Sequence, residues 1–242
     1  MEKNNNIASL AQSLKLPVFG SYSEYVESGM SIEDALVELM TREYERRHEA
    51  SVKRRVKSAG LPHGKTIDTF KLAASIPHLK NDQLQDIATC RFVKDKRNIC
   101  ALGGQGTGKT HLMAAIGHEA VRLGYTVKFL RVSDMLTMLN EASTEKKLGA
   151  TMKTLLKTNL ICMDELGYVT LTLKKAQLLF DVIAKRSEVG GSIYVTSNYS
   201  FSDWPNFLGD EVLTKALVGK LAGDAIVLNM NGEDYRIASK KT

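Results

Sequence analysis

A glycine-rich segment followed by lysine and threonine constrains the fold of this chain of 242 residues more than any other feature. Residues 103–110 fit the pattern G-x-x-x-x-G-K-[ST], whose glycines allow positive φ angles and a close approach of the backbone to a ligand. The N–H groups of such a loop and the positive end of the following helix attract phosphate, while Lys109 adds charge and the Thr110 hydroxyl suits Mg²⁺. The pattern predicts a nucleotide-phosphate loop built from Gly103, Gly104, Gln105, Gly106, Thr107, Gly108, Lys109, Thr110 and His111.

The segments on either side of this loop have the patterns that it requires. Residues 98–102 form a short apolar run typical of a buried strand, and residues 112–120 repeat apolar side chains at helical spacing before Gly124. A glycine turn with a purely structural role would need neither flank. We therefore expect a strand, the phosphate loop and a helix in succession.

Two adjacent acidic residues follow a second apolar run. Residues 160–163 predict a buried strand that ends in Asp164 and Glu165, and ligands of parallel sheets bind at the carboxyl ends of the strands. We expect Asp164 to act with Thr110 on Mg²⁺ and Glu165 to polarise the attacking water. Asn198 follows the next β-rich run, where its amide either contacts this water or the γ-phosphate, or simply caps a loop.

Strand and helix patterns alternate after residue 60, which is typical of an α/β fold with a parallel sheet. Before that point the apolar residues recur at helical spacing, and residues 60–64 have the composition of a linker. We therefore expect a small helical N-terminal domain at residues 1–60, which binds a partner or DNA, and a nucleotide-binding domain at residues 61–242.

Two segments are rich in cations, the second half of the helix predicted over residues 31–56 and the amphipathic segment 145–157. Such a charge run is most often a solvated helix face, but beside a phosphate loop it also fits contact with DNA or RNA. The net charge of +6, from 33 Lys and Arg against 27 Asp and Glu, favours a polyanionic partner without proving one. The candidates for this contact are Arg46, Arg47, Lys53, Arg54, Arg55, Lys57, Lys146, Lys147 and Lys153.

The hydropathy pattern indicates a protein of the cytoplasm with no membrane partner. No apolar run approaches the roughly 18 residues of a membrane span, and the polar N-terminus has no signal-peptide core. Cys90, Cys100 and Cys162 are odd in number and are expected as small core residues rather than as disulfides or metal ligands. Trp204 lies between two phenylalanines and is likewise expected in the core.

Several phrases of the sequence match one known family. They are G-T-G-K-T-H-L at residues 106–112, M-D-E-L-G-Y at 163–168, T-S-N at 196–198, F-S-D-W at 201–204 and Y-R at 235–236. Together they resemble the IstB-like transposition helper ATPases, relatives of the helicase loader DnaC within the AAA+ class. The resemblance implies a five-stranded parallel sheet flanked by helices, with the strand before the P-loop at its centre, and Mg²⁺-dependent hydrolysis of ATP. It also identifies Asn198 as the sensor amide.

The resemblance further implies partners for the protein. It predicts ATP-dependent oligomerisation on duplex DNA, with ATP at the subunit interfaces, and delivery of target DNA to a partner transposase. The chain ends soon after a hairpin predicted around Asn231 and Gly232, so we expect no large C-terminal lid domain.

One departure from the family pattern affects the shared site. The family reads D-R-L, with an arginine that would reach the γ-phosphate of a neighbouring subunit, where this chain reads Gly219, Lys220 and Leu221. Lysine lacks the planar fork of arginine. Either Lys220 acts weakly in trans, or another residue such as Arg186 takes this role.

Three other functions fit parts of the same pattern. A replicative helicase loader of the DnaC type would share the ATPase machinery, and a neighbouring transposase gene would tell the two apart. A small-molecule kinase would use the same loop but needs a lid over the acceptor, and no lid-like arginine cluster is apparent. A nucleotide-gated DNA clamp with negligible turnover would be consistent with Lys220.

Overall fold

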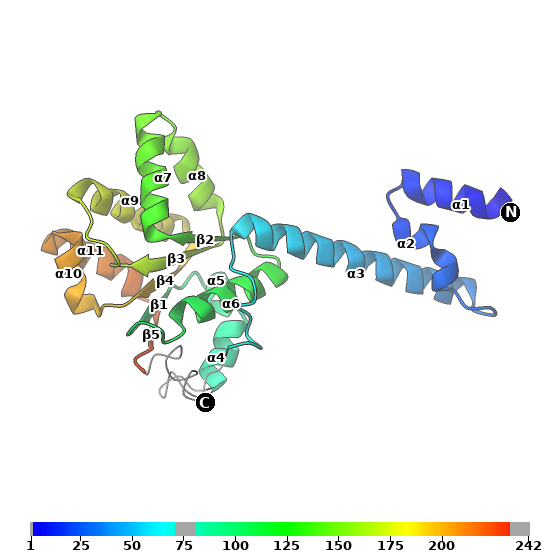
Figure 1. Ribbon diagram of the computed structural model, residues 1–242, viewed down its shortest axis with the longest axis horizontal. Coiled ribbons are helices and arrows are strands. Elements are labelled where there is room, and N and C mark those ends of the chain that lie inside the picture. The colour runs from blue at the N-terminus through cyan, green and yellow to red at the C-terminus, as the bar shows by residue number, and fades with distance from the viewer. Residues whose placement is uncertain (1, 71–80, 233–242) are drawn as a thin grey trace. The chain divides into compact units, whose positions relative to one another are not determined.

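The computed structural model describes residues 2–70 and 81–232 of the chain (Figure 1). The chain divides into two compact units between Arg54 and Arg55. Sequence analysis placed this division after residue 60, within the segment that follows the helix ending at Ala59. Within the described ranges, no helix combines the length and the apolar content that a membrane crossing requires.

The elements alternate between helices and strands from β1 onward, as the sequence predicts. The strands are β1 (Ile99–Leu102), β2 (Val127–Arg131), β3 (Leu160–Leu166), β4 (Ser192–Ser197) and β5 (Ile226–Asn229). The α-helices are α1 (Glu2–Ser13), α2 (Pro17–Gly20), α3 (Ile32–Ala59), α4 (Asn81–Ala88), α5 (Arg91–Lys94), α6 (Lys109–Arg122), α7 (Val132–Thr144), α8 (Leu148–Lys157), α9 (Leu173–Val189), α10 (Trp204–Leu208) and α11 (Glu211–Ala222), with 3-10 turns η1 (Tyr22–Glu24) and η2 (Phe201–Asp203).

The N-terminal unit is helical, as expected, and one buried carboxylate organises it. The Glu43 side chain on α3 accepts hydrogen bonds from the Val18 N–H at 3.2 Å and from Arg46 and Arg47 at 2.8 Å each. Arg47 also donates to the Lys15 carbonyl at 2.7 Å. Burial alone would raise the pKa of Glu43, but these hydrogen bonds outweigh it and lower the pKa to about 2.

The second unit contains a five-stranded sheet in the order β2-β3-β4-β1-β5, and every adjacent pair of strands is parallel. The expected five-stranded parallel sheet is therefore confirmed. The expectation that the strand before the glycine-rich loop is central is wrong, because β4 occupies the middle and β1 lies between β4 and β5. β1 nevertheless has a neighbour on each side, and its residues Ile99, Cys100 and Ala101 are fully buried.

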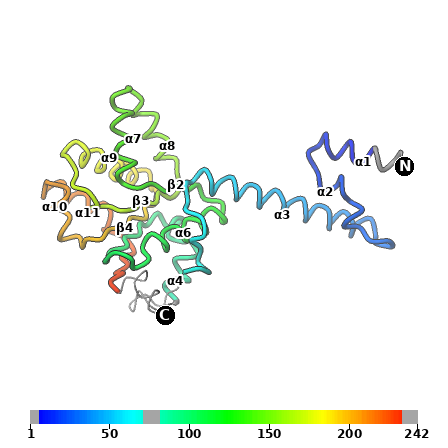
Figure 2. Tube along the Cα trace, viewed as in Figure 1, coloured from blue at the N-terminus to red at the C-terminus, as the bar shows by residue number. Residues whose placement is uncertain are grey.

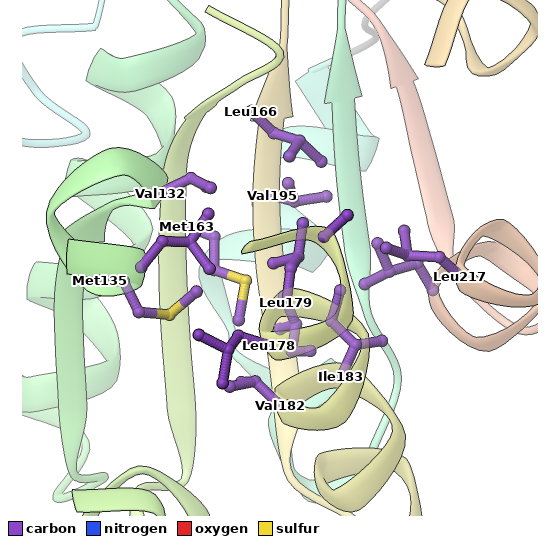
Figure 3. Packing of buried hydrophobic residues seen from close by; sticks show 14 of the residues in the cluster. Val132, Met135, Met163, Leu166, Leu178, Leu179, Val182, Ile183, Val195 and Leu217 are labelled. Atoms are coloured by element: carbon purple, nitrogen blue, oxygen red, sulfur yellow. The ribbon is translucent and has the colours of Figure 1, made fainter. Parts of the chain in front are cut away.

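Helices cover both faces of this sheet, which explains why β3 and β4 are buried almost throughout. On one face, side chains of α7, α9 and α11 meet Met163 and Leu166 of β3 and Val195 of β4 (Figure 3). On the other face, α6 packs against β2, β3 and β4. Trp204 and the three cysteines are buried, as predicted, and burial raises the pKa of the Cys90 and Cys100 thiols to about 12.

Two further sequence expectations are refined by the structure. The helix predicted over residues 145–157 begins only at Leu148, because the chain turns at Lys146 with a φ of 58°. α7 and α8 lie side by side (Figure 1). The second arm of the predicted C-terminal hairpin, residues 235–237, lies outside the described residues.

Candidate nucleotide-binding site

The glycine-rich loop connects the end of β1 to the start of α6. Gly106 and Gly108 adopt φ angles of 71° and 90°, in the left-handed region that favours glycine. Gly103 has a φ of 152°, and a Cβ there would collide with the backbone of Met230. The first turn of α6 leaves the N–H groups of residues 109–111 without intrahelical acceptors, so they are placed to receive an anion.

Lys109 lies over this loop. Its ammonium donates to the Gly103 carbonyl at 2.7 Å and also to the Gly104 carbonyl, and its side chain is almost fully buried. Thr107 closes the loop from within, because its buried hydroxyl donates to the Gly104 carbonyl at 3.0 Å. A cation is therefore held where the loop N–H groups and the helix end converge.

The sequence-predicted metal pair is brought together. The Thr110 hydroxyl donates to Asp164 Oδ1 at 2.9 Å, although the two residues are far apart in the chain. Thr196 on β4 donates to the same oxygen at 2.6 Å, a contact that sequence analysis missed. Within residues 2–70 and 81–232 there is no group of three or more His, Cys, Asp or Glu that could hold a metal. A hydroxyl and one carboxylate suit Mg²⁺ that takes its remaining ligands from phosphates and water.

A bulge in β3 directs Glu165 into the same space as Asp164. The pairing of β3 with β4 shifts between Met163 and Leu166, and Glu165 has a φ of 62°. Successive residues of a regular strand point to opposite faces, so the bulge allows both acids to line one cavity. A left-handed conformation at a non-glycine residue costs about 1–2 kcal/mol. The Thr196 hydroxyl offsets part of this cost by accepting a hydrogen bond from the Glu165 N–H at 3.0 Å.

Arg131 is a second residue of this site that sequence analysis missed. It ends β2 directly opposite Asp164 in the register of the sheet. Its Nε lies 3.5 Å from Glu165 Oε2, and both side chains are partly exposed. The guanidinium thus holds the carboxylate of Glu165 at the rim of the cavity.

The cavity itself has a volume of about 700 Å³ and collects most of the predicted residues. Residues 105–111, Asp164, Glu165 and Asn198 line it, and Asn198 follows directly after β4. The position of β4 between β3 and β1 explains this arrangement, because the carboxyl ends of all three strands meet at one edge.

The segment predicted as a linker, residues 60–64, and the residues that follow it form one wall of the cavity. Residues 60–70 run along α6 toward the glycine-rich loop (Figure 2). The Pro62 carbonyl contacts His118 Nε2 at 2.9 Å, and the Thr69 hydroxyl contacts His111 Nε2 at 3.1 Å. The Phe70 ring lies 5.5 Å from the His111 ring and packs beside Gly108. Phe70 gives the cavity an apolar wall, for which the sequence carries no periodic signal.

The two residues considered for action on a neighbouring subunit lie away from this cavity. Lys220 is exposed near the end of α11. Arg186 is fully buried and donates to the carbonyls of Leu155, Thr158, Asn159 and Ser192 at 2.6 to 3.0 Å. Burial lowers the pKa of Arg186 to about 10, so it remains charged at neutral pH. The suggestion that Arg186 acts on another subunit is therefore corrected: its guanidinium connects α8, β4 and the segment before β3.

The basic candidates differ in whether a carboxylate pairs with them. Arg46 and Arg47 bind Glu43, and Lys147 pairs with Glu145 at 2.8 Å. Arg55 is partly buried, and its Nε has no hydrogen-bond partner among the described residues. Lys53 is exposed and lies 4.0 Å from Glu49. The remaining candidates are exposed: Arg54, Lys57, Lys146 and Lys153.

Comparison with known proteins agrees with this geometry. The chain is similar to a protein of Geobacillus stearothermophilus that is named as an ATP-binding protein of insertion sequence IS5376, with 35% identity over 94% of this chain and 92% of the relative. It is also similar to the corresponding protein of IS21 from Pseudomonas aeruginosa, with 33% identity over 84% of this chain and 76% of that one.

Solved structures show the same fold at lower identity. The DnaC helicase loader has a TM-score of 0.56 and 22% identity, over 71% of this chain and 98% of that one. The replication initiator DnaA, bound to AMPPCP and single-stranded DNA, has a TM-score of 0.58 and 16% identity, over 75% of this chain and 55% of that one. The fold is thus that of the AAA+ P-loop proteins. Residues 9–242 match the family described as IstB-like ATP binding protein, and the chain belongs to that family.

Proposed function

We propose that this protein is an ATPase that binds and oligomerises on duplex DNA and helps a transposase engage its target DNA. The observation that carries the proposal is the convergence of the glycine-rich loop, the Thr110–Asp164 pair and Glu165 on one cavity of about 700 Å³. The names of the relatives, ATP-binding proteins of insertion sequences, support the link to transposition.

In this proposal the nucleotide phosphates bind the N–H groups at the start of α6, and Lys109 exchanges its loop carbonyls for phosphate oxygens. Thr110 and Asp164 would hold Mg²⁺, which neutralises charge on the β- and γ-phosphates when it is bound. Thr196 keeps Asp164 and the backbone of Glu165 in place through its hydroxyl.

Hydrolysis requires an oriented water in line with the γ-phosphate. Glu165 accepts a proton from this water as its oxygen bonds to phosphorus and the bond to ADP breaks. The amide of Asn198, at the end of β4, donates to the γ-phosphate or to the water. The purine lies against Phe70, whose aromatic ring packs beside Gly108 and His111 and offers a stacking surface next to the phosphate loop.

DNA contact is assigned to exposed cations on two helices. Lys53, Arg54 and Lys57 lie on α3 within little more than one helical turn, and Lys153 lies on α8. Because these residues would neutralise DNA phosphates, affinity falls with salt at a log–log slope of roughly −0.9 for each phosphate contacted.

The test is ATP turnover with and without duplex DNA, with particle size recorded in the same samples. We expect DNA and ATP together to produce large assemblies and faster hydrolysis. Lys109→Ala removes the charge at the phosphates and abolishes turnover, and Glu165→Gln leaves ATP binding intact but blocks hydrolysis.

Other outcomes identify the competing functions. A protein that stays monomeric and ignores DNA contradicts the proposal, and stimulation by a small acceptor molecule would indicate a kinase. A Glu165→Gln variant whose residence on DNA equals that of the wild type would indicate a clamp with negligible turnover.

A further inference from the structure

A second cavity of about 700 Å³ lies away from the nucleotide site. It is formed by the residues before β1 and by the ends of α9 and α11, and its walls carry three cations, Lys96, Arg97 and Lys220. Lys96 and Arg97 precede β1, whereas the glycine-rich loop follows it. The length of β1, about 13 Å for four residues, separates these two cations from the loop. Lys220, near the end of α11, lines the same cavity, so all three cations lie away from the phosphate loop of their own chain.

Arg97 lines this cavity, and only the Nε atom of its guanidinium is held by another residue among those described. Its Nε is held by Asp224, with the backbone carbonyl at 3.2 Å and the carboxylate at 3.5 Å. Over residues 2–70 and 81–232, the two terminal amines of Arg97 make no hydrogen bond, and the side chain is 39% exposed. An arginine anchored through Nε keeps the planar pair of donors that binds a phosphate at two points.

The backbone around Arg97 is tied to the helix that carries Lys220. The neighbouring Asn98 donates to the Leu221 carbonyl at 3.0 Å and accepts the Ile193 N–H at 2.9 Å. One amide thus connects the start of β1 with the end of α11 and with β4. The two cations, Arg97 and Lys220, are consequently positioned by one rigid junction rather than by separate loops.

The charge of the cavity indicates what it can receive. Glu188 and Asp224 also line it, so three cations and two acids leave a net charge of +1. Such a site attracts a free anion weakly, because the acids oppose it. A phosphate that a second molecule holds in place needs no such attraction, and it requires only donors of the right geometry.

We propose that Arg97 is the trans-acting arginine of this protein, donating to the γ-phosphate of a nucleotide bound by a second copy of the chain. Lys220 supplies the adjacent point charge, and Arg97 supplies the planar fork that lysine lacks. This inference rests on the proposed ATPase function. Arg186 cannot take the role because its guanidinium is buried among carbonyls.

The test compares Arg97→Ala and Arg97→Lys with a matched control. Arg91→Ala removes another exposed arginine that precedes β1 and pairs through Nε with an aspartate at 3.5 Å, outside the cavity. We expect Arg97→Ala to reduce DNA-stimulated turnover by at least about 100-fold, since arginines acting in trans contribute about 10³ to 10⁵ in rate. Arg97→Lys should recover little of it, while ATP affinity and the unfolding temperature of all three variants stay at wild-type values.

A mixing experiment identifies action between copies. Arg97→Ala protein retains its own phosphate loop, and Lys109→Ala protein retains Arg97, so a mixture of the two inactive proteins forms some complete sites. We expect turnover in the mixture to exceed the sum of the two separate samples. Wild-type turnover in Arg97→Ala, or the absence of recovery on mixing, overturns the inference while the proposed function stands. If the wild-type protein does not hydrolyse ATP, both the proposed function and the inference about Arg97 are overturned, so wild-type turnover is measured first.

Discussion

Replacing Arg186 by methionine tests whether this buried cation is a structural connector. Methionine keeps an apolar stem of similar length but removes the four hydrogen bonds to main-chain carbonyls. Two of these acceptors, the carbonyls of Leu155 and Asn159, also receive backbone N–H groups. The Ser192 carbonyl belongs to β4, whose Ser192 pairs with Leu160 of β3, so the loss falls mainly on the Thr158 carbonyl. At about 1–3 kcal/mol for a buried acceptor left unsatisfied, we expect a destabilisation of about 2 kcal/mol.

A domain of this size shifts its unfolding temperature by about 2–4 °C per kcal/mol, so Arg186→Met should lower the unfolding temperature by roughly 4–8 °C. Circular dichroism on heating measures this shift, and Lys185→Met, an exposed neighbour on α9, should change it by less than about 2 °C. Turnover per folded molecule should persist. An unchanged unfolding temperature combined with lost turnover would refute a structural role for Arg186 and would indicate that it acts between subunits.

Three further predictions concern other polar contacts. Glu43→Gln should destabilise the helical unit at pH 7, because the hydrogen bonds that lower the pKa of Glu43 to about 2 stabilise only its charged form. The difference in unfolding free energy between variant and wild type should narrow as the pH falls from about 4.5 to 2, and a difference that does not vary with pH contradicts this. Arg131→Met should raise DNA-independent turnover by about 2–5-fold by releasing Glu165, as expected for a partly exposed ion pair, and unchanged turnover would assign that pair no role. Thr196→Val should lower kcat by about tenfold with little effect on ATP affinity, and Thr196→Ser should restore it.

The sequence was sufficient for the elements whose signals are local. The glycine-rich pattern and the run ending in Asp164 predicted two strands and a helix at the observed places. The parallel sheet followed from the alternation of strand and helix patterns. Strand order did not follow, because β1 and β4 both have the pattern of a buried strand, and the pairing between segments far apart in the chain decides which of them is central.

By itself, then, the sequence determined the α/β class, the phosphate loop and the two acids near the carboxyl end of β3, since each depends on residues close together in the chain. The tertiary structure decided which distant groups share a cavity. Thr196, Arg131 and Phe70 reach the site from separate segments of the chain. Arg186 is fully buried and is therefore excluded as a residue that acts on another subunit. Such contacts carry no periodic signal, because burial and hydrogen bonding depend on neighbours that are brought together only when the strands align.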